Sequence, residues 1–239
     1  MTTIAQQVQA VNAQMKLSAS MAGRAADVVQ LLAVSKTFGV GHVQAAWDAG
    51  QRAFGENYVQ EAIAKIGALA ALKGNIEWHL IGPLQSNKTA LVAENFDWVQ
   101  TVDRLKIAQR LNDQRSAHLP PLQVCIQVNV DGGKTKSGVD CTSSLQPLLD
   151  MARQMGTLPR LTLRGLLAIP EPESDPTKQH AVFAKVRRAF DFLNVNLDAG
   201  HQLDTLSMGM SADFEAAIAA GSTMVRVGSA IFGERQYTS

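Results

Sequence analysis

Hydrophobic residues gather along the chain in short runs that are separated by polar or glycine-containing positions. Runs of this length, rich in Val, Ile and Leu and bounded by polar residues, are typical of buried β-strands. The pattern predicts eight strands, at Leu31–Ser35, Ala53–Gly55, Glu77–Ile81, Trp98–Gln100, Leu122–Val130, Leu161–Ala168, Thr205–Ser207 and Thr223–Val227.

Helical patterns fill the intervals between these runs. Amphipathic stretches, each long enough to connect two parallel strands, lie near residues 41–49, 57–71, 87–95, 104–117, 143–155, 177–194 and 211–220. Eight strands that alternate with helices predict an α/β protein with a closed (β/α)8 or TIM barrel. A doubly wound open sheet is the alternative, because the second and fourth runs are short. The segment Pro170–Lys178, with three prolines and three acidic residues, is predicted to be an exposed loop.

The first 22 residues predict an additional helix that packs on the barrel. Ile4, Val8, Val11 and Met15 recur at spacings of four and three, so that they form one apolar stripe. The other face is rich in glutamine rather than lysine, which favours packing over binding to a membrane surface. Because no linker rich in Pro, Gly or Ser divides the chain, residues 1–239 are predicted to form a single domain.

Composition argues against several classes of function. Hydrophobic residues make up 46% of the chain and charged residues 18%, as expected for a folded protein with a large core. The formal charge of +1 gives no field that would attract nucleic acid or an acidic membrane. Cys125 and Cys141 are too few for a disulfide framework, and no signal peptide is visible, so we expect a cytoplasmic protein. The five histidines show no metal-ligand spacing, and no metal is expected.

Residues that follow the strands of a barrel meet at one mouth, where ligands bind. Here many of them are polar or small: Lys36, Glu56, Asn57, Gly82, Asp103, Asn129, Gly209, Ser211, Gly228 and Ser229. Lys36 is brought to the mouth by the first strand. A lone lysine at a strand end commonly extends into solvent, whereas a partly desolvated amine forms an imine with a carbonyl ligand. Lys36 alone does not decide between the two interpretations.

Two turns near the C-terminus have the composition of an anion site. The segment Ser207–Asp213 combines glycine with a hydroxyl at the predicted start of a helix, where Ser211 is also a candidate N-cap. Gly228 and Ser229 follow the last strand, so that their backbone amides could face a phosphate. Two such turns after the last two strands match the phosphate site that is common in barrels of this class.

Two further features carry less information. Gly132–Thr135 follows a strand, but Val128 occupies the position of the first glycine of a P-loop, so we reject a nucleotide site of that kind. His79 lies within the third predicted strand. It could face the inside of the barrel as a ligand or be a hydrogen-bonded core histidine, and the sequence leaves both open.

Six ordered segments between about Leu31 and Arg235 resemble the pyridoxal phosphate homeostasis protein family, the YggS and PROSC proteins. These segments are Ala33–Lys36, Phe54–Glu61, His79–Lys88, Arg164–Pro170, Leu206–Ser211 and Val225–Gly233. Two positions depart from the pattern, since many relatives carry glutamate in place of Gly133 and methionine in place of Leu167. The first difference removes an acid or base from that loop, and the second conserves volume.

The resemblance implies a fold-type III barrel like the N-terminal domain of alanine racemase, with pyridoxal 5′-phosphate (PLP) joined to Lys36 as a Schiff base. It places the phosphate against the Ser211 hydroxyl and the backbone amides of Gly228 and Ser229, and it places Arg226 opposite the pyridine nitrogen. Three further residues are expected to line the cofactor pocket, namely Asn57, His79 and Met208.

The implied function is PLP homeostasis: the protein would store, buffer or deliver the cofactor, with apo forms of PLP enzymes as recipients, and would not be an enzyme. Alanine racemases add a β-rich domain that supplies a tyrosine base, whereas only six residues follow Gly233 here, with Tyr237 among them. A PLP-dependent amino-acid racemase and a Schiff-base aldolase for sugar phosphates are the alternatives. The absence of a coiled-coil pattern leads us to expect a monomer.

Overall fold

Nine parallel strands form one sheet in the computed structural model, which describes residues 2–132 and 137–233. The strands are β1 (Gln30–Val34), β2 (Ala53–Glu56), β3 (Glu77–Leu80), β4 (Trp98–Val102), β5 (Leu122–Asn129), β6 (Val139–Asp140), β7 (Leu161–Ala168), β8 (Thr205–Met210) and β9 (Met224–Val227). Eight of them coincide with the predicted runs. The two-residue strand β6 was not predicted, because two residues carry no periodic signal.

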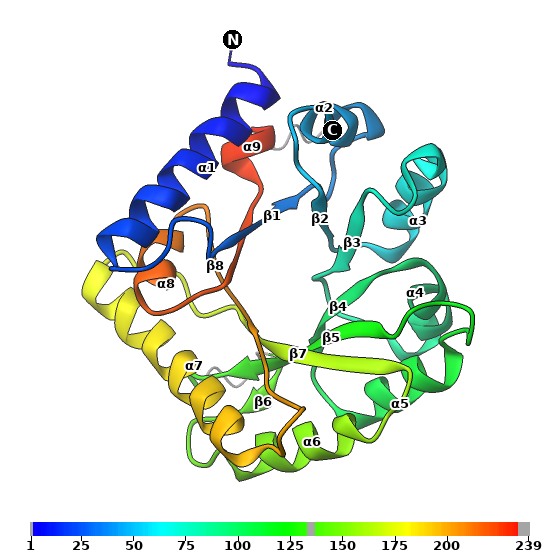
Figure 1. The fold of residues 1–239 in the computed structure, drawn as a ribbon, viewed down its shortest axis with the longest axis vertical. Coiled ribbons are helices and arrows are strands. Elements are labelled where there is room, and N and C mark those ends of the chain that lie inside the picture. Colours follow the sequence, from blue (N-terminus) through cyan, green and yellow to red (C-terminus); the bar gives the residue numbers. More distant parts are fainter. Residues whose placement is uncertain (1, 133–136, 234–239) are drawn as a thin grey trace.

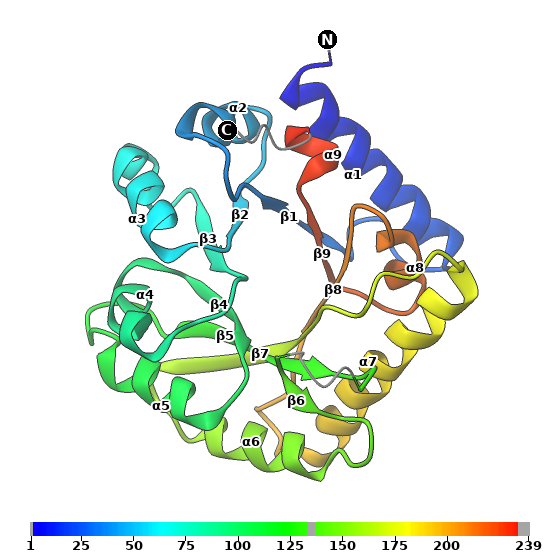
Figure 2. The same ribbon diagram turned by 180° about the vertical axis from the view of Figure 1, so that it is seen from behind.

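The sheet closes on itself. Its order is β4-β3-β2-β1-β9-β8-β7-β5-β6, and β4 also pairs with β5, with Trp98 opposite Gln123 and Val99 opposite Val124. The pairing of β4 with β5 joins the two sides of the sheet, so the prediction of an eight-stranded barrel is confirmed and the open sheet is excluded. Figure 1 shows the strands at the centre of a ring of helices, and Figure 2 shows the same ring from behind.

Helices surround the barrel on the outside, and most of them connect successive strands (Figure 1). They are α1 (Ile4–Met21), α2 (Val40–Asp48), α3 (Val59–Ala68), α4 (Thr89–Asn95), α5 (Leu105–Gln114), α6 (Gln146–Gly156), α7 (Pro176–Asn196), α8 (Phe214–Ala219) and α9 (Ser229–Phe232), with short 3-10 turns at Ala70–Leu72 and Ser86–Lys88. The N-terminal helix α1 lies against α8, α9 and α2, and its buried residues include Val8, Val11 and Met15.

The boundary between the predicted loop Pro170–Lys178 and the helix after it differs from the prediction. Helix α7 begins at Pro176, so the last three residues of the segment Pro170–Lys178 are helical rather than loop. The side chain of Asp175 caps this helix by accepting hydrogen bonds from the backbone amides of Thr177 and Lys178. Proline suits the first helical position, where no amide hydrogen is needed. The proline that suggested a loop therefore marks the start of a helix.

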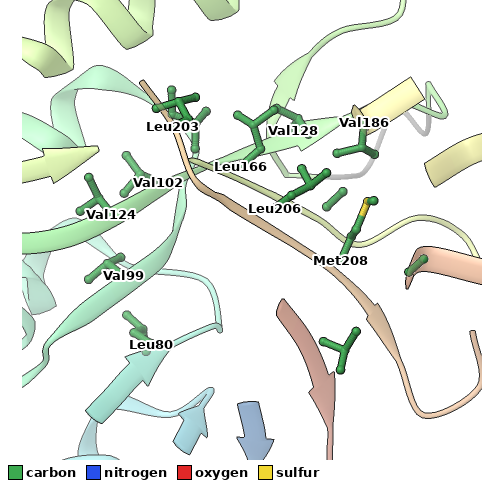
Figure 3. Close-up of a cluster of buried hydrophobic side chains, with 14 of the residues drawn as sticks. Leu80, Val99, Val102, Val124, Val128, Leu166, Val186, Leu203, Leu206 and Met208 are labelled. Atoms are coloured by element: carbon green, nitrogen blue, oxygen red, sulfur yellow. The ribbon is translucent and has the colours of Figure 1, made fainter. Parts of the chain in front are cut away.

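Side chains alternate along the strands between two buried layers. The larger cluster joins the outer faces of the strands to the helices and includes Leu80, Val124, Leu166 and Leu206 (Figure 3). Smaller clusters fill the inside of the barrel: Leu32, Val34, Ala53, Ile81 and Met224 form one, and Trp98, Cys125 and Leu167 form the other. Burial on both faces explains why the strands read as continuous hydrophobic runs.

Candidate functional site

A cavity of about 690 Å³ lies at the carboxyl ends of the strands. Its described lining residues lie in β1, β8 and β9 or in the segments that follow β1, β2, β3, β7, β8 and β9. They are Val34, Lys36, Phe38, Asn57, Ile81, Ile169, Met210, Ser211, Ala212, Arg226, Gly228, Ser229 and Gly233. Ligands bind at this end in barrels of this class. Closure of the sheet therefore brings the polar residues after β1, β2, β8 and β9 to one place.

Six of the eight residues that we expected to contact a cofactor line this cavity: Lys36, Asn57, Ser211, Arg226, Gly228 and Ser229. The other two do not. Met208 is fully buried near Val186 between the barrel and the helices (Figure 3), because its neighbour Ser207 faces the inside of the barrel. His79 is also fully buried, and its side chain bonds to Gln100. The observed lining therefore differs from the expected one at these two positions.

Lys36 follows β1 by two residues and is half-buried in the cavity wall. The preceding residue, Ser35, is fully buried, and its amide donates to the carbonyl of Gly55 on β2. The next residue, Thr37, has a φ of +69°. This left-handed conformation is uncommon for a β-branched residue, and it turns the chain immediately after the lysine.

Asn57 reaches the cavity because two backbone segments approach closely. A side chain at Gly82, just after β3, would place its Cβ 2.3 Å from the backbone oxygen of Asn57, so only glycine fits there. The side-chain oxygen Oδ1 of Asn57 is buried and has no hydrogen-bond partner among the described residues. A buried acceptor without a donor is costly, and a ligand that donates a hydrogen bond would satisfy it.

The turn after β8 presents Ser211 to the cavity. Gly209 has a φ of +95°, which glycine adopts without strain. The amide of Met210 then donates to Oδ1 of Asp213, which occupies the N-cap position of α8. Ser211 is therefore not the N-cap that we expected, because the helix begins three residues later. Its half-buried hydroxyl has no hydrogen-bond partner within the described chain.

Gly228 and Ser229 lie where β9 turns into the short helix α9, which the sequence did not predict. Gly228 occupies the N-cap position, and its carbonyl accepts from the amides of Ile231 and Phe232. The first amides of a helix lack partners within that helix. In barrels of this class a phosphate commonly binds at such a short helix after the last strands.

Arg226 brings a buried positive charge to the cavity from β9. Its side chain is fixed at two points, because Nη1 donates to Oγ of Ser207 at 2.9 Å and Nη2 donates to the carbonyl of Ala168 at 2.9 Å. Burial lowers the pKa of Arg226 to about 10, against the opposing effect of Asp213. The guanidinium therefore remains protonated at neutral pH.

A line of hydrogen bonds continues from Arg226 through the inside of the barrel. The hydroxyl of Ser207 donates to Oε1 of Gln100 at 2.7 Å, and Nε2 of Gln100 lies 2.8 Å from Nδ1 of His79. Since the amide nitrogen donates, Nδ1 accepts and the histidine proton belongs on Nε2. Nε2 lies 3.4 Å from a carboxylate oxygen of Glu77, without the geometry of a hydrogen bond.

Burial lowers the pKa of His79, and the nearby Glu77 only partly opposes this effect. The ring is therefore neutral at pH 7, and it stacks on Trp98 with 5.0 Å between ring centroids. This resolves the question left open by the sequence: His79 faces the inside of the barrel and is hydrogen-bonded there. Gln100 and Ser207 had no signal in the sequence, because only the barrel register brings them to Arg226.

The charges of the cavity define the ligands that suit it. Lys36 and Arg226 are the ionisable side chains among the described residues of the lining, and both are cationic types. Ser211 and Ser229 add hydroxyls, and Asn57 adds a carbonyl oxygen that has no hydrogen-bond partner among the described residues. The amine, the guanidinium and the hydroxyls fit an anion that also carries a carbonyl group, because the amine can react with the carbonyl while the other donors bind the anion. The Asn57 oxygen can accept a hydrogen bond from a donor group of the ligand.

Other expectations concern the chain outside the cavity. Within residues 2–132 and 137–233, no three His, Cys, Asp or Glu side chains come together as candidate metal ligands. In the same ranges no helix has the length and hydropathy needed to cross a membrane. Gly133, with its loop, and Tyr237 lie outside the described residues.

Comparison with known proteins identifies the class of barrel. Residues 7–236 match the family model of the alanine racemase N-terminal domain. An alanine racemase from Clostridium difficile superposes with a TM-score of 0.66 at 16% identity, over 95% of this chain and 58% of that one. At this level of identity the likeness concerns the fold. The class is therefore the alanine racemase-like TIM barrel.

Relatives of similar length define the family more narrowly. The pyridoxal phosphate homeostasis protein of Escherichia coli K12 is 51% identical over 239 residues, which are 100% of this chain and 99% of that protein. The protein of the same name from Pseudomonas aeruginosa is 53% identical over 237 residues, 99% and 98% of the two chains. PipY of Synechococcus elongatus, solved with PLP bound, has a TM-score of 0.81 and 35% identity over 96% of this chain and 100% of its own. This chain belongs to the family of pyridoxal phosphate homeostasis proteins, as the sequence motifs predicted.

Proposed function

We propose that this protein binds PLP at the barrel mouth, holds it as a Schiff base on Lys36, and serves PLP homeostasis without substantial turnover of amino acids. One observation carries the proposal: the described lining offers an amine and a guanidinium but no carboxylate, histidine, cysteine or tyrosine. The names of the relatives and the PLP bound to PipY support the choice of PLP among anionic carbonyl compounds.

Lys36 would hold the aldehyde group of the cofactor. PLP, when bound, supplies an aldehyde that reacts reversibly with amines. Lys36 is half-buried in the cavity wall and lies immediately before a left-handed turn. An amine in the wall of the cavity is placed to react with the carbonyl group of a bound ligand. Lys36 therefore suits a lasting but reversible bond to the cofactor.

Ser211, Gly228 and Ser229 would hold the phosphate. The Ser211 hydroxyl lines the cavity without a partner in the described chain, and Gly228 with Ser229 opens α9 beside it in the same lining. Hydrogen bonds from a hydroxyl and from backbone amides are strong when the acceptor is an anion. Asn57, which follows β2, would accept a hydrogen bond from a donor group of the cofactor rather than contact the phosphate.

Arg226 would face the pyridine nitrogen. A guanidinium has only donors and remains positively charged, so it disfavours protonation of the ring nitrogen. A pyridine ring whose nitrogen is unprotonated withdraws electrons less strongly than a ring whose nitrogen is protonated and paired with a carboxylate. Ser207 and Ala168 hold the guanidinium in this position, so the barrel itself would keep the cofactor a weak electron acceptor.

The lining also bears on turnover. A racemase needs two bases, one on each face of the substrate, and each typically contributes about 10²–10⁴-fold to the rate. Lys36 is one candidate base, and the described lining supplies no second one, since Arg226 stays protonated near neutral pH. We infer that the cofactor is carried rather than used in catalysis.

Two assays test this function together. Holo-protein is incubated with common L- and D-amino acids while chiral composition and keto-acid release are followed, and it is also mixed with an apo form of a PLP enzyme. We expect negligible turnover and recovery of activity in the apo-enzyme. Turnover on the order of 1–10³ s⁻¹, the range of ordinary enzymes, would contradict the carrier role and favour a racemase. A colourless protein that borohydride traps only with a sugar phosphate would favour an aldolase instead.

We propose that the protein acts in the cytoplasm. We also propose that it is a monomer with a single domain. Cys125 and Cys141 are both free thiols, which suits a reducing compartment. Apo forms of PLP enzymes are the proposed recipients. Size-exclusion chromatography with light scattering measures the mass in solution, and a mass of twice 25.7 kDa would contradict the monomer.

A further inference from the structure

A cluster of three charged residues lies directly behind the segment that carries Lys36. Lys65 on α3 is only 4% exposed, and its ammonium nitrogen lies 2.7 Å from Oε1 of Glu56 and 2.6 Å from Oε1 of Glu61. It also donates to the backbone oxygen of Ser35 at 2.7 Å. An ammonium group has three hydrogens to donate, and these three acceptors use all of them. The contacts of Lys65 are therefore complete.

The same cluster fixes the residue on each side of Lys36. On the N-terminal side, the Ser35 carbonyl accepts from Lys65 and the Ser35 hydroxyl donates to Oε1 of Glu56 at 2.5 Å. On the C-terminal side, the amide of Thr37 donates to Oε1 of Glu61 at 2.6 Å. Charge-assisted hydrogen bonds of this kind are stronger than neutral ones. The backbone position of Lys36 is therefore set from both directions by one ionic cluster.

Thr37 shows that the segment needs such support. Its φ of +69° is left-handed, and this conformation is unfavourable for a β-branched residue. It persists only where contacts with the surrounding structure hold it in place. Glu61 supplies that restraint through the Thr37 amide. If the restraint were lost, Thr37 would relax toward an ordinary φ. The direction in which the chain leaves Lys36 would then change.

Stability alone does not explain why charged residues occupy this place. Glu56 is fully buried, and its second oxygen, Oε2, has no partner among the described residues. Burial raises the pKa of Glu56, against the opposing effects of Lys65 and Ser35. Buried ion pairs are often no more stabilising than apolar side chains of similar volume. The charged side chains, in contrast, form directional hydrogen bonds to the backbone of Ser35 and Thr37, which apolar side chains cannot form.

We propose that Glu56, Glu61 and Lys65 form an ionic clamp that positions Lys36 for its bond with the carbonyl ligand. This role rests on the proposed function, because it assumes that Lys36 forms the Schiff base. The three residues are positioning residues, since they act through the backbone of Ser35 and Thr37. The clamp lowers the number of orientations available to the amine before the ligand arrives, which favours bond formation.

Glu61→Ala tests the clamp, because Glu61 is half-buried and bonds the Thr37 amide directly. Glu61→Gln is the conservative variant, since it keeps an oxygen acceptor for that amide. Gln60→Ala is the matched control: Gln60 is exposed on the same helix, and its side chain makes no hydrogen bond within the described residues. The full-length variants are loaded with PLP at one subsaturating concentration and reduced with borohydride, and the adduct on Lys36 is quantified by peptide mass spectrometry.

Glu61→Ala removes the charge-assisted bonds to the Thr37 amide and to Lys65. This loss should lower the adduct yield or its rate of formation about tenfold. Glu61→Gln should recover much of the loss, and Gln60→Ala should match the wild type. Hydrogen exchange of the Thr37 amide, measured without PLP, should be faster in Glu61→Ala and unchanged in the control. The same exchange experiment also reports whether each variant is folded, because amides in the core of a folded protein stay protected.

The two proposals fail in different ways. If the wild type gives no adduct on Lys36, the proposed Schiff base is wrong, whatever the Thr37 amide does. If the wild type gives the adduct and folded Glu61→Ala gives the same yield at the same rate, the clamp has no positioning role. Faster exchange at Thr37 together with a reduced adduct yield supports the clamp.

Discussion

At the scale of single residues, the cavity combines a positive charge in a fixed position with a hydroxyl that has no hydrogen-bond partner among the described residues. Arg226 is restrained by Ser207 and Ala168, whereas Ser211 has no hydrogen-bond partner in the described chain. A group of the first kind is already oriented before a ligand binds. A group of the second kind gains a bond when the ligand arrives. The two kinds should therefore respond differently to substitution.

Ser211→Ala should weaken PLP binding by about ten- to a hundredfold, because a charge-assisted hydrogen bond to phosphate is worth about 1.5–3 kcal/mol. Pyridoxal, which lacks the phosphate, should bind poorly to the wild type and should be affected little by the substitution. Titration of both compounds by absorbance or fluorescence measures this. Equal affinity of the wild type for pyridoxal and PLP would show that the phosphate site is elsewhere.

The two cysteines report on burial at two places in the fold: Cys125 lies inside the barrel, and Cys141 is half-buried after β6. Burial raises the pKa of Cys125 to about 12, and burial with the charge of Asp140 raises that of Cys141 to about 11. A cysteine attacks thiol reagents as the thiolate, so neither residue should react readily at pH 8. In Cys141→Ser, the remaining Cys125 should react with a colorimetric thiol reagent only after unfolding. Rapid labelling of Cys125 in the native variant would contradict the packing against Trp98 and Leu167.

His79 and Met208 show what single residues do not reveal in a sequence. Both lie in family motifs, yet neither lines the cavity. Met208 lies on the outer face of its strand, because side chains alternate between the two faces. His79 faces the inside of the barrel, where it is fully buried and bonded to Gln100. Lys65 shows the opposite error. A lysine within a helix normally extends into solvent, and nothing in the sequence indicates that this one is buried against Glu56.

At the scale of helices and strands, the hydrophobic pattern located all eight long strands, because both faces of each strand are buried. It located their ends less well. β4 and β8 extend two and three residues past the predicted runs, as far as Val102 and Met210. Short elements such as β6 and α9 lack enough residues for a periodic signal. The clamp and the hydrogen-bond line were beyond prediction, because both depend on register between strands and on helix packing.

Close contact between neighbouring strand ends also sets the shape of the mouth. Gly82→Ala would bring a Cβ to 2.3 Å from the Asn57 backbone, so the two segments must move apart. We expect a loss of about 1–3 kcal/mol in the free energy of unfolding and weaker binding of PLP, measured by chemical denaturation and by titration. Gly67→Ala on α3 is the control, because nothing lies within 4 Å of a Cβ there. An equal effect of both substitutions would indicate a general intolerance of alanine rather than a local clash.

At the scale of the whole molecule, the closed barrel explains how distant segments form one site. The lining residues run from Val34 to Gly233, and they meet because eight parallel strands end at the same mouth. Lys36 and Ser211 come from opposite ends of the sequence but from β1 and β8, which both flank β9. The amine and the proposed phosphate site are thus separated by a single strand.

Borohydride reduction of the PLP-loaded protein shows whether Lys36 carries PLP. Proteolysis and mass spectrometry then identify the modified lysine, with Lys36→Ala as the comparison. We expect the stable adduct on the peptide that contains Lys36, and no adduct in Lys36→Ala, even though phosphate contacts still retain some cofactor. Lys65 is an internal control, because its ammonium is already bonded to two carboxylates and a carbonyl. Recovery of the adduct chiefly on a lysine other than Lys36 would show that the Schiff base does not form on Lys36.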